Sequence, residues 1–207
     1  MHAKPWVRIT HRISAAVLAL FLVTHLLNHV VGLWGIAAHI AFMDAARLVY
    51  RSSAVEPLLL AAVVVQTVTG AVQVWAGWGT RRGFWPRLQA ISGLYLAFFL
   101  VNHTFWVLVA RLSYGLDSNF HLAATFLTIA PLPILFAPYY AMGVFALLAH
   151  LACAVRLRSD GETGHRIAQV FIGCGAVLAV VIVAVFMGAF YEIHLPPAYR
   201  ALVEPFL

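Results

Sequence analysis

The chain has 207 residues, of which 63% are hydrophobic and only 10% are charged. A soluble domain carries roughly a quarter charged residues, so this composition excludes a soluble fold and predicts an integral membrane protein. The net charge of +6 comes from basic residues that flank the apolar segments, so it gives no reason to infer binding to nucleic acid.

Five apolar segments are long enough to cross a bilayer, which takes about 20 helical residues. In chain order they are residues 13–34, 57–78, 88–112, 139–157 and 167–191. We therefore predict an all-α fold, with one membrane domain of five transmembrane helices that covers residues 1–207. The connection at 35–56 is long enough for a short helix, whereas three prolines disfavour a continuous helix through 113–138.

The basic residues predict the orientation of these helices. Nine of the thirteen lysine and arginine residues lie before the first span or in the connections after the second and fourth spans, which share one side of the membrane. The other four lie on the opposite side. By the positive-inside rule, the N-terminus is cytoplasmic and the C-terminus is outside. The nine are Lys4, Arg8, Arg12, Arg81, Arg82, Arg87, Arg156, Arg158 and Arg166, and the four are Arg47, Arg51, Arg111 and Arg200.

The first and third predicted spans resemble each other. Residues 13–25 read ISAAVLALFLVTH and residues 91–103 read ISGLYLAFFLVNH, with eight of thirteen positions identical. Apolar helices share leucine, alanine, valine and phenylalanine by composition alone. Composition does not explain the matched serines, Ser14 and Ser92, or the matched histidines, His25 and His103.

The matched histidines are candidate haem ligands. Both helices run in the same direction, and His25 and His103 follow their basic flanks by similar distances, so the two imidazoles are expected at one depth in the outer half of the bilayer. An ionisable residue inside a membrane is costly and is a functional hypothesis by default. Two at one level fit bis-imidazole ligation of a haem iron, held non-covalently because no C-x-x-C-H motif occurs. His29, one turn beyond His25, is a rival ligand or a partner for a haem propionate.

The fourth span adds His150, nearer the cytoplasmic side. A second haem there would need another ligand, and the second span offers Gln66 or Gln73 but no histidine. Simpler interpretations remain open: His150 equally fits a hydrogen bond between helices, and Ser14 and Ser92 fit helix packing better than quinone contacts. Other histidines are expected to be solvated or interfacial, since they lie near termini or loops: His2, His39, His121, His165 and His194.

The chain resembles the five-helix cytochrome b membrane anchor of succinate:quinone oxidoreductases and fumarate reductases. The resemblance covers most of the chain up to the fifth helix, and it depends on the order and spacing of short segments. These are the basic entry before Ser14, F-L-V-T-H-L-L-N around His25, F-M-D at 42–44, Glu56 at the start of the second span, Q-T-V-T-G at 66–70, L-Q-A-I-S-G at 88–93 leading to His103, and His150.

The resemblance implies a haem b electron-transfer subunit in the inner (cytoplasmic) membrane that is catalytic only in its complex. In the family, four histidines on the first four helices bind two stacked haems. His25 and His103 match the distal pair and His150 matches one proximal ligand, but Gln66 stands where the fourth histidine is expected, so one haem is expected and the second stays open.

The resemblance also implies partners for this chain. A flavoprotein and an iron-sulfur subunit of the tricarboxylic acid cycle enzyme would dock on the cytoplasmic face, and a membrane quinone would exchange electrons with the complex. Candidate quinone contacts are His11, Arg12, Ser14 and Ser92 near the cytoplasmic side, and Asp44 and Glu56 near the outer side. An oligomer of the whole complex stays open.

Two alternatives remain at this point. The chain also fits the cytochrome b anchor of another quinone-linked dehydrogenase or a hydrogenase, although the F-M-D and L-Q-A-I-S-G segments argue against it. In the other alternative, a haem-free membrane scaffold or small transporter, His25 and His103 only tie helices together.

Overall fold

A computed structural model describes residues 3–159 and 161–207. Within these ranges the chain is helical, without a β-strand. The α-helices are α1 (Pro5–Val31), α2 (Ile36–Tyr50), α3 (Val55–Gly77), α4 (Phe84–Leu112), α5 (Phe120–Thr128), α6 (Pro133–Arg156), α7 (Gly161–Phe186) and α8 (Pro197–Val203). Short 3-10 turns extend α1, α3 and α8: η1 (Gly32–Trp34), η2 (Trp78–Thr80) and η3 (Glu204–Phe206).

Five of the described helices, α1, α3, α4, α6 and α7, are long and apolar enough to cross a membrane. Their outer surfaces carry large apolar side chains, such as Leu20, Val180 and Trp75, which is 89% exposed. A water-soluble protein rarely exposes so many contiguous apolar groups, whereas lipid solvates them. The prediction of an all-α, multi-pass membrane protein with five spans is confirmed.

Several bounds of the spans differ from the predicted ones, and three of these differences have a local cause. The first helix begins at Pro5 rather than at residue 13, so the basic segment before Ser14 is part of the helix. The fourth begins at Pro133, since proline is tolerated in a first helical turn, and Pro138 lies inside it. The fifth was expected to reach residue 191 but ends at Phe186, where Gly188 takes the left-handed φ of 79° that terminates many helices.

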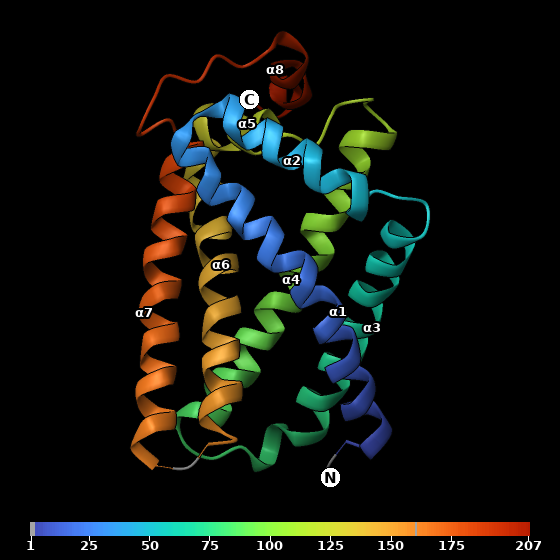
Figure 1. The fold of residues 1–207 in the computed structure, drawn as a ribbon, viewed down its shortest axis with the longest axis vertical. Helices are drawn as coiled ribbons and strands as arrows, with labels where there is room; N and C mark the ends of the chain where they lie inside the picture. The colour runs from blue at the N-terminus through green and yellow to red at the C-terminus, as the bar shows by residue number, and fades with distance from the viewer. Residues whose placement is uncertain (1–2, 160) are drawn as a thin grey trace.

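The three shorter helices gather at one end of the bundle, opposite the N-terminus, and α2 is the short helix expected between residues 35 and 56 (Figure 1). Here α5 inserts Phe120 and Leu127 against Val185 and Phe186 of α7 to form the main buried core. The two termini lie at opposite ends of the bundle, as an odd number of spans requires. We call these the N-terminal end and the capped end.

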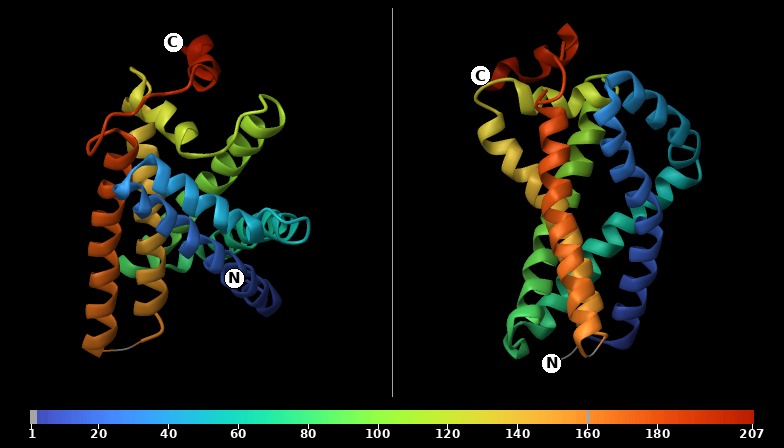
Figure 2. Two further views of the ribbon diagram at one scale, coloured as in Figure 1. Left: turned by 45° about the horizontal axis from the view of Figure 1, so that its top comes forward. Right: turned by 60° about the vertical axis from the view of Figure 1, so that its left-hand side comes forward.

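Between the ends, the long helices pack in two neighbouring pairs, α1 with α3 and α4 with α6, and α7 packs along α6 (Figure 2). Glycines allow the closest approaches. A Cβ atom on Gly175 of α7 would lie 2.7 Å from the Cβ of Leu148 on α6, well inside van der Waals contact. Small residues bring helices together in membranes because van der Waals packing drives their association there.

Candidate functional site

His25 of α1 and His103 of α4 lie close together, although they come from separate helices. Their ring centroids are 6.0 Å apart and their planes are inclined by 62°. Each ring stacks on the phenylalanine four residues earlier on its own helix, His25 on Phe21 at 5.2 Å and His103 on Phe99 at 5.3 Å. Residues four apart share a helix face, so these stacks hold both imidazoles towards the same interior.

The spacing of the pair fits two imidazoles on one iron. With imidazole–metal bonds of about 2 Å and roughly 1 Å from each nitrogen to its ring centre, the centroids of two axial imidazoles lie about 6 Å apart. The observed 6.0 Å agrees with this value. The distance between these rings therefore fits a pair of imidazoles that would hold one haem iron.

A further cluster of polar side chains extends from His25 towards the capped end. The Nε2 atom of His29 lies 3.2 Å from Nε2 of His25, and its Nδ1 atom lies 3.4 Å from Nε2 of His39 on α2. The amide of Asn28 lies 3.1 Å from the same Nε2 atom. His29 thus lies beside the candidate ligands, where either predicted role, rival ligand or propionate partner, stays a prediction.

Of the histidines expected to be solvated or interfacial, His39 is buried, with only 2% of it exposed. His165 and His194 are exposed as expected, and His2 lies outside the described residues. His39 lies on the inner face of α2, where Met43 one turn later is also buried. Burial, followed by the positive charge of Arg47 and by His121, lowers the pKa of His39 to about 4, so it is neutral near pH 7. The inward spacing of His39 and Met43 was the sequence signal that could have identified it.

A second polar cluster lies near the N-terminal end, between α1 and α3. Ser14 donates to Oε1 of Gln66 at 2.6 Å, and the amide of Gln66 lies 3.1 Å from Nε2 of His11. The Nδ1 atom of His11 lies 3.0 Å from the hydroxyl of Thr69, which itself donates to the Val65 carbonyl. These directions are all satisfied when His11 is neutral with its proton on Nδ1.

The matching contact between α4 and α6 joins Ser92 and His150. The Ser92 hydroxyl lies 3.2 Å from Nδ1 of His150 and donates to the Leu88 carbonyl. Nδ1 of His150 also lies 3.1 Å from the Gln89 carbonyl, to which it donates. This leaves the lone pair of His150 on Nε2, the arrangement that a carbonyl partner imposes on metal-binding histidines.

The two clusters are related by the internal similarity of the sequence. Ser14 and Ser92 are equivalent in the repeat, and their partners on the neighbouring helices are Gln66 and His150. Gln66 therefore stands at the position in its helix pair that His150 has in the other. A glycine of the neighbouring helix lies against each histidine ring. A Cβ atom on Gly70 of α3 would lie 3.3 Å from the His11 ring, and one on Gly93 of α4 would lie 3.0 Å from the His150 ring.

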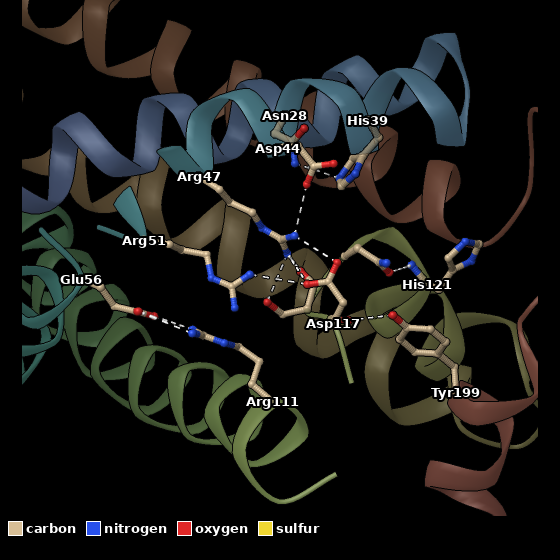
Figure 3. Close-up of polar contacts among 12 residues, drawn as sticks. Asn28, His39, Asp44, Arg47, Arg51, Glu56, Arg111, Asp117, His121 and Tyr199 are labelled. Atoms are coloured by element: carbon tan, nitrogen blue, oxygen red, sulfur yellow. Dashed lines mark hydrogen bonds and ion pairs between the residues drawn. The ribbon is translucent and has the colours of Figure 1, made fainter. Parts of the chain in front are cut away.

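The remaining candidate quinone residues lie apart from these clusters. Arg12 is exposed at the N-terminal end. Asp44 and Glu56 lie towards the capped end, where Asp44 is 3.3 Å from Arg47 and Glu56 forms an ion pair with Arg111 of α4 (Figure 3). The six predicted quinone contacts thus fall into two groups at opposite ends, and the structure does not bring the acids together with His11.

Arg47 organises the cap and was missed as a structural residue. Its guanidinium lies 2.9 Å from Asp117 and donates to the Ser118 carbonyl, while Tyr199 of α8 donates to the Asp117 carbonyl (Figure 3). Burial raises the pKa of Asp117, but the hydrogen bond and charge of Arg47 outweigh it and hold that pKa below its usual value. This network ties α2 and α8 over the ends of the spanning helices.

Comparisons with protein-family models, with curated proteins and with solved structures find no match to this chain.

Proposed function

We propose that this chain is the haem b membrane anchor of a succinate dehydrogenase or fumarate reductase complex in the cytoplasmic membrane. It would pass electrons between an iron-sulfur subunit and a membrane quinone, and it would be catalytic only in that complex. The observation that carries the proposal is the pair of imidazoles from His25 and His103, 6.0 Å apart on two separate spanning helices.

The chain's own residues supply ligation and insulation. His25 and His103 would each give one nitrogen to the iron, and Phe21 and Phe99 keep their rings in place. A haem held in this way supplies one-electron transfer, which couples single-electron clusters to a two-electron quinone. His29 and Asn28 lie on the capped side of the pair, where they would donate hydrogen bonds to carboxylate groups of the haem.

The cluster of Ser14, Gln66 and His11 supports a single haem in this proposal. Gln66 is engaged with both Ser14 and His11, and an amide is a poor iron ligand compared with imidazole. His150 would then have no histidine at the equivalent position of α3 to share an iron with. Ser14, His11 and Ser92 line the cytoplasmic half in this orientation and are the proposed hydrogen-bonding groups for a quinone.

The soluble partners would meet the N-terminal end. The positive-inside prediction places this end in the cytoplasm, where nine of the thirteen basic residues would face a flavoprotein and its iron-sulfur subunit. A basic surface favours encounter with an acidic partner.

The test is to purify the chain with its native partners and record the reduced absorption spectrum. We expect one b-type haem per chain that succinate reduces, and we expect His25→Ala and His103→Ala each to remove the band. His194→Ala is the matched control because His194 is exposed in the tail, 3.7 Å from Glu192, and it should keep the full band. A purified wild-type complex without haem, or full haem in both ligand variants, would overturn the proposal.

A further inference from the structure

Two adjoining hollows lie at the N-terminal end, on the side of the bundle where α1 and α3 pack together. The first, of about 430 Å³, is lined by Arg8, Gln73, Thr80, Arg81 and Arg82. The second, of about 390 Å³, is lined mainly by Trp6, Val7, Val68 and Val72. Ala3 borders both, so the two hollows adjoin at this residue.

The first hollow is strongly basic. It collects three guanidinium groups, and no acidic side chain is among the described residues that line it. Arg81 donates to the carbonyls of Val74 and Gln73, which fixes its guanidinium under the last turn of α3 without neutralising its charge. In residues 3–159 and 161–207, no ion pair involves Arg8, Arg81 or Arg82. The hollow is therefore suited to an anion.

The second hollow is an apolar furrow that continues along the spanning helices. Arg81 donates to the carbonyls of Gln73 and Val74, so its guanidinium lies at the level of these residues on α3, beside Val72. Val68 lies between five and six positions further along the helix, or about 8 Å at 1.5 Å per residue. Half of a bilayer's hydrocarbon core is about 15 Å thick. The furrow thus begins where the basic hollow ends and covers about half of the depth of one leaflet, which is room for the first part of an acyl chain.

We propose that this site binds one anionic glycerophospholipid, with its phosphate against Arg8, Arg81 and Arg82 and an acyl chain along Val68 and Val72. Basic pockets between transmembrane helices are suited to anionic headgroups. A quinone offers no charge to the three guanidiniums, and an acidic partner protein would not fill the apolar furrow. The proposal is independent of haem binding.

The probe is phosphatidylglycerol added to the purified full-length chain in neutral detergent, measured by native mass spectrometry and by thermal melting. We expect one tightly bound lipid and a higher melting temperature. Phosphatidylcholine and inorganic phosphate should each have much weaker effects, because one lacks net charge and the other lacks the acyl chain.

Arg8→Gln with Arg82→Gln is the test variant, since Arg81 also holds the end of α3 and is left in place. At about 1 kcal/mol per basic residue near an anionic lipid, affinity for phosphatidylglycerol should fall roughly thirtyfold. Arg158→Gln with Arg166→Gln removes the same formal charge from the α6–α7 turn and from the start of α7, where Arg166 pairs with Glu162, and should bind as the wild type does. Val68→Trp, which fills the furrow, should weaken the binding of phosphatidylglycerol without changing the charge of the site.

Several results would overturn the proposal. Equal weakening in the two arginine pairs would show a general charge effect, and equal binding of phosphatidylcholine would remove the role of the guanidiniums. A phosphate effect as large as that of the lipid, or unchanged binding in Val68→Trp, would leave an anion site without a lipid chain. A quinone that displaces the lipid at equal concentration would reassign the site.

Discussion

Gly143 of α6 lies against Phe99, the ring that stacks on the candidate haem ligand His103, so adding one methyl group there should disturb both packing and haem binding. A Cβ atom at this position would lie 2.5 Å from Cε2 of Phe99 and 2.7 Å from two further ring atoms. Carbon atoms normally approach to about 3.5–4.0 Å, so the Phe99 ring must move by about 1 Å. That ring is stacked on His103 at 8° and is also packed against Tyr139.

The expected cost of Gly143→Ala follows from two opposing effects. Overpacking costs about 1–3 kcal/mol, while alanine gains up to about 1 kcal/mol of helix propensity over glycine. With the full gain subtracted, the net loss is up to about 2 kcal/mol, or up to roughly 8 °C in melting temperature for a chain of this length. Because the displaced ring pushes on His103, haem content should fall as well.

Thermal melting and the haem-to-protein ratio measure the two effects. Gly173→Ala is the matched control, because no atom lies within 4 Å of its Cβ position, and it should be at least as stable as the wild type. Phe99→Leu in the Gly143→Ala chain should restore the melting temperature by making room for the methyl group, but haem content should stay low because the ring that positions His103 is gone. If Gly143→Ala matches Gly173→Ala in both assays, the inferred role of Phe99 in positioning His103 is wrong.

Three further predictions address other contacts. Glu56→Gln and Arg111→Gln should show a coupling energy of about 0.5–1 kcal/mol in a double-mutant cycle, because the ion pair is only 28% and 19% exposed; zero coupling would deny that it ties α3 to α4. The pKa of His39 is lowered to about 4 in the folded chain. Between about pH 6.5 and 4 the unfolded chain therefore binds a proton that the folded chain does not. The free energy of unfolding should fall by up to about 3 kcal/mol as the pH drops through this window. His39→Gln should flatten that slope in melts across the window, and an unchanged slope would contradict the burial of a neutral imidazole. Gln66→His places an imidazole at the position equivalent to His150 and should raise the pyridine haemochrome count from about one to about two per chain; no gain would argue against that equivalence.

Much of the fold was predictable because a bilayer imposes length and composition on each span. The five apolar segments and the short helix between the first two spans follow from the sequence, and so does the depth match of His25 and His103, since a straight helix converts sequence spacing into height. The end of α7 at Phe186 was not predictable, because apolar residues continue to 191 and only the backbone conformation of Gly188 marks the end.

The partners of the site residues were less predictable than the residues themselves. Hydrophobic periodicity identifies the inner face of a helix, but the rotation of one helix relative to another decides which side chains meet. The contacts of Gln66 with His11 and Ser14, and the stacking of Phe99 behind His103, depend on that rotation. His39 was expected in solvent because its segment was treated as a connection between spans. A short helix was expected there, but which of its faces points inward was not predicted.

The central claim is that the imidazoles of His25 and His103 bind one iron from opposite sides. Electron paramagnetic resonance of the oxidised, purified chain tests it most directly, together with the His103→Gly variant with and without added imidazole. We predict a low-spin bis-imidazole signal in the wild type, its loss in His103→Gly, and its return when free imidazole fills the vacated position. A bis-imidazole signal that persists unchanged in both His25→Gly and His103→Gly would contradict the account.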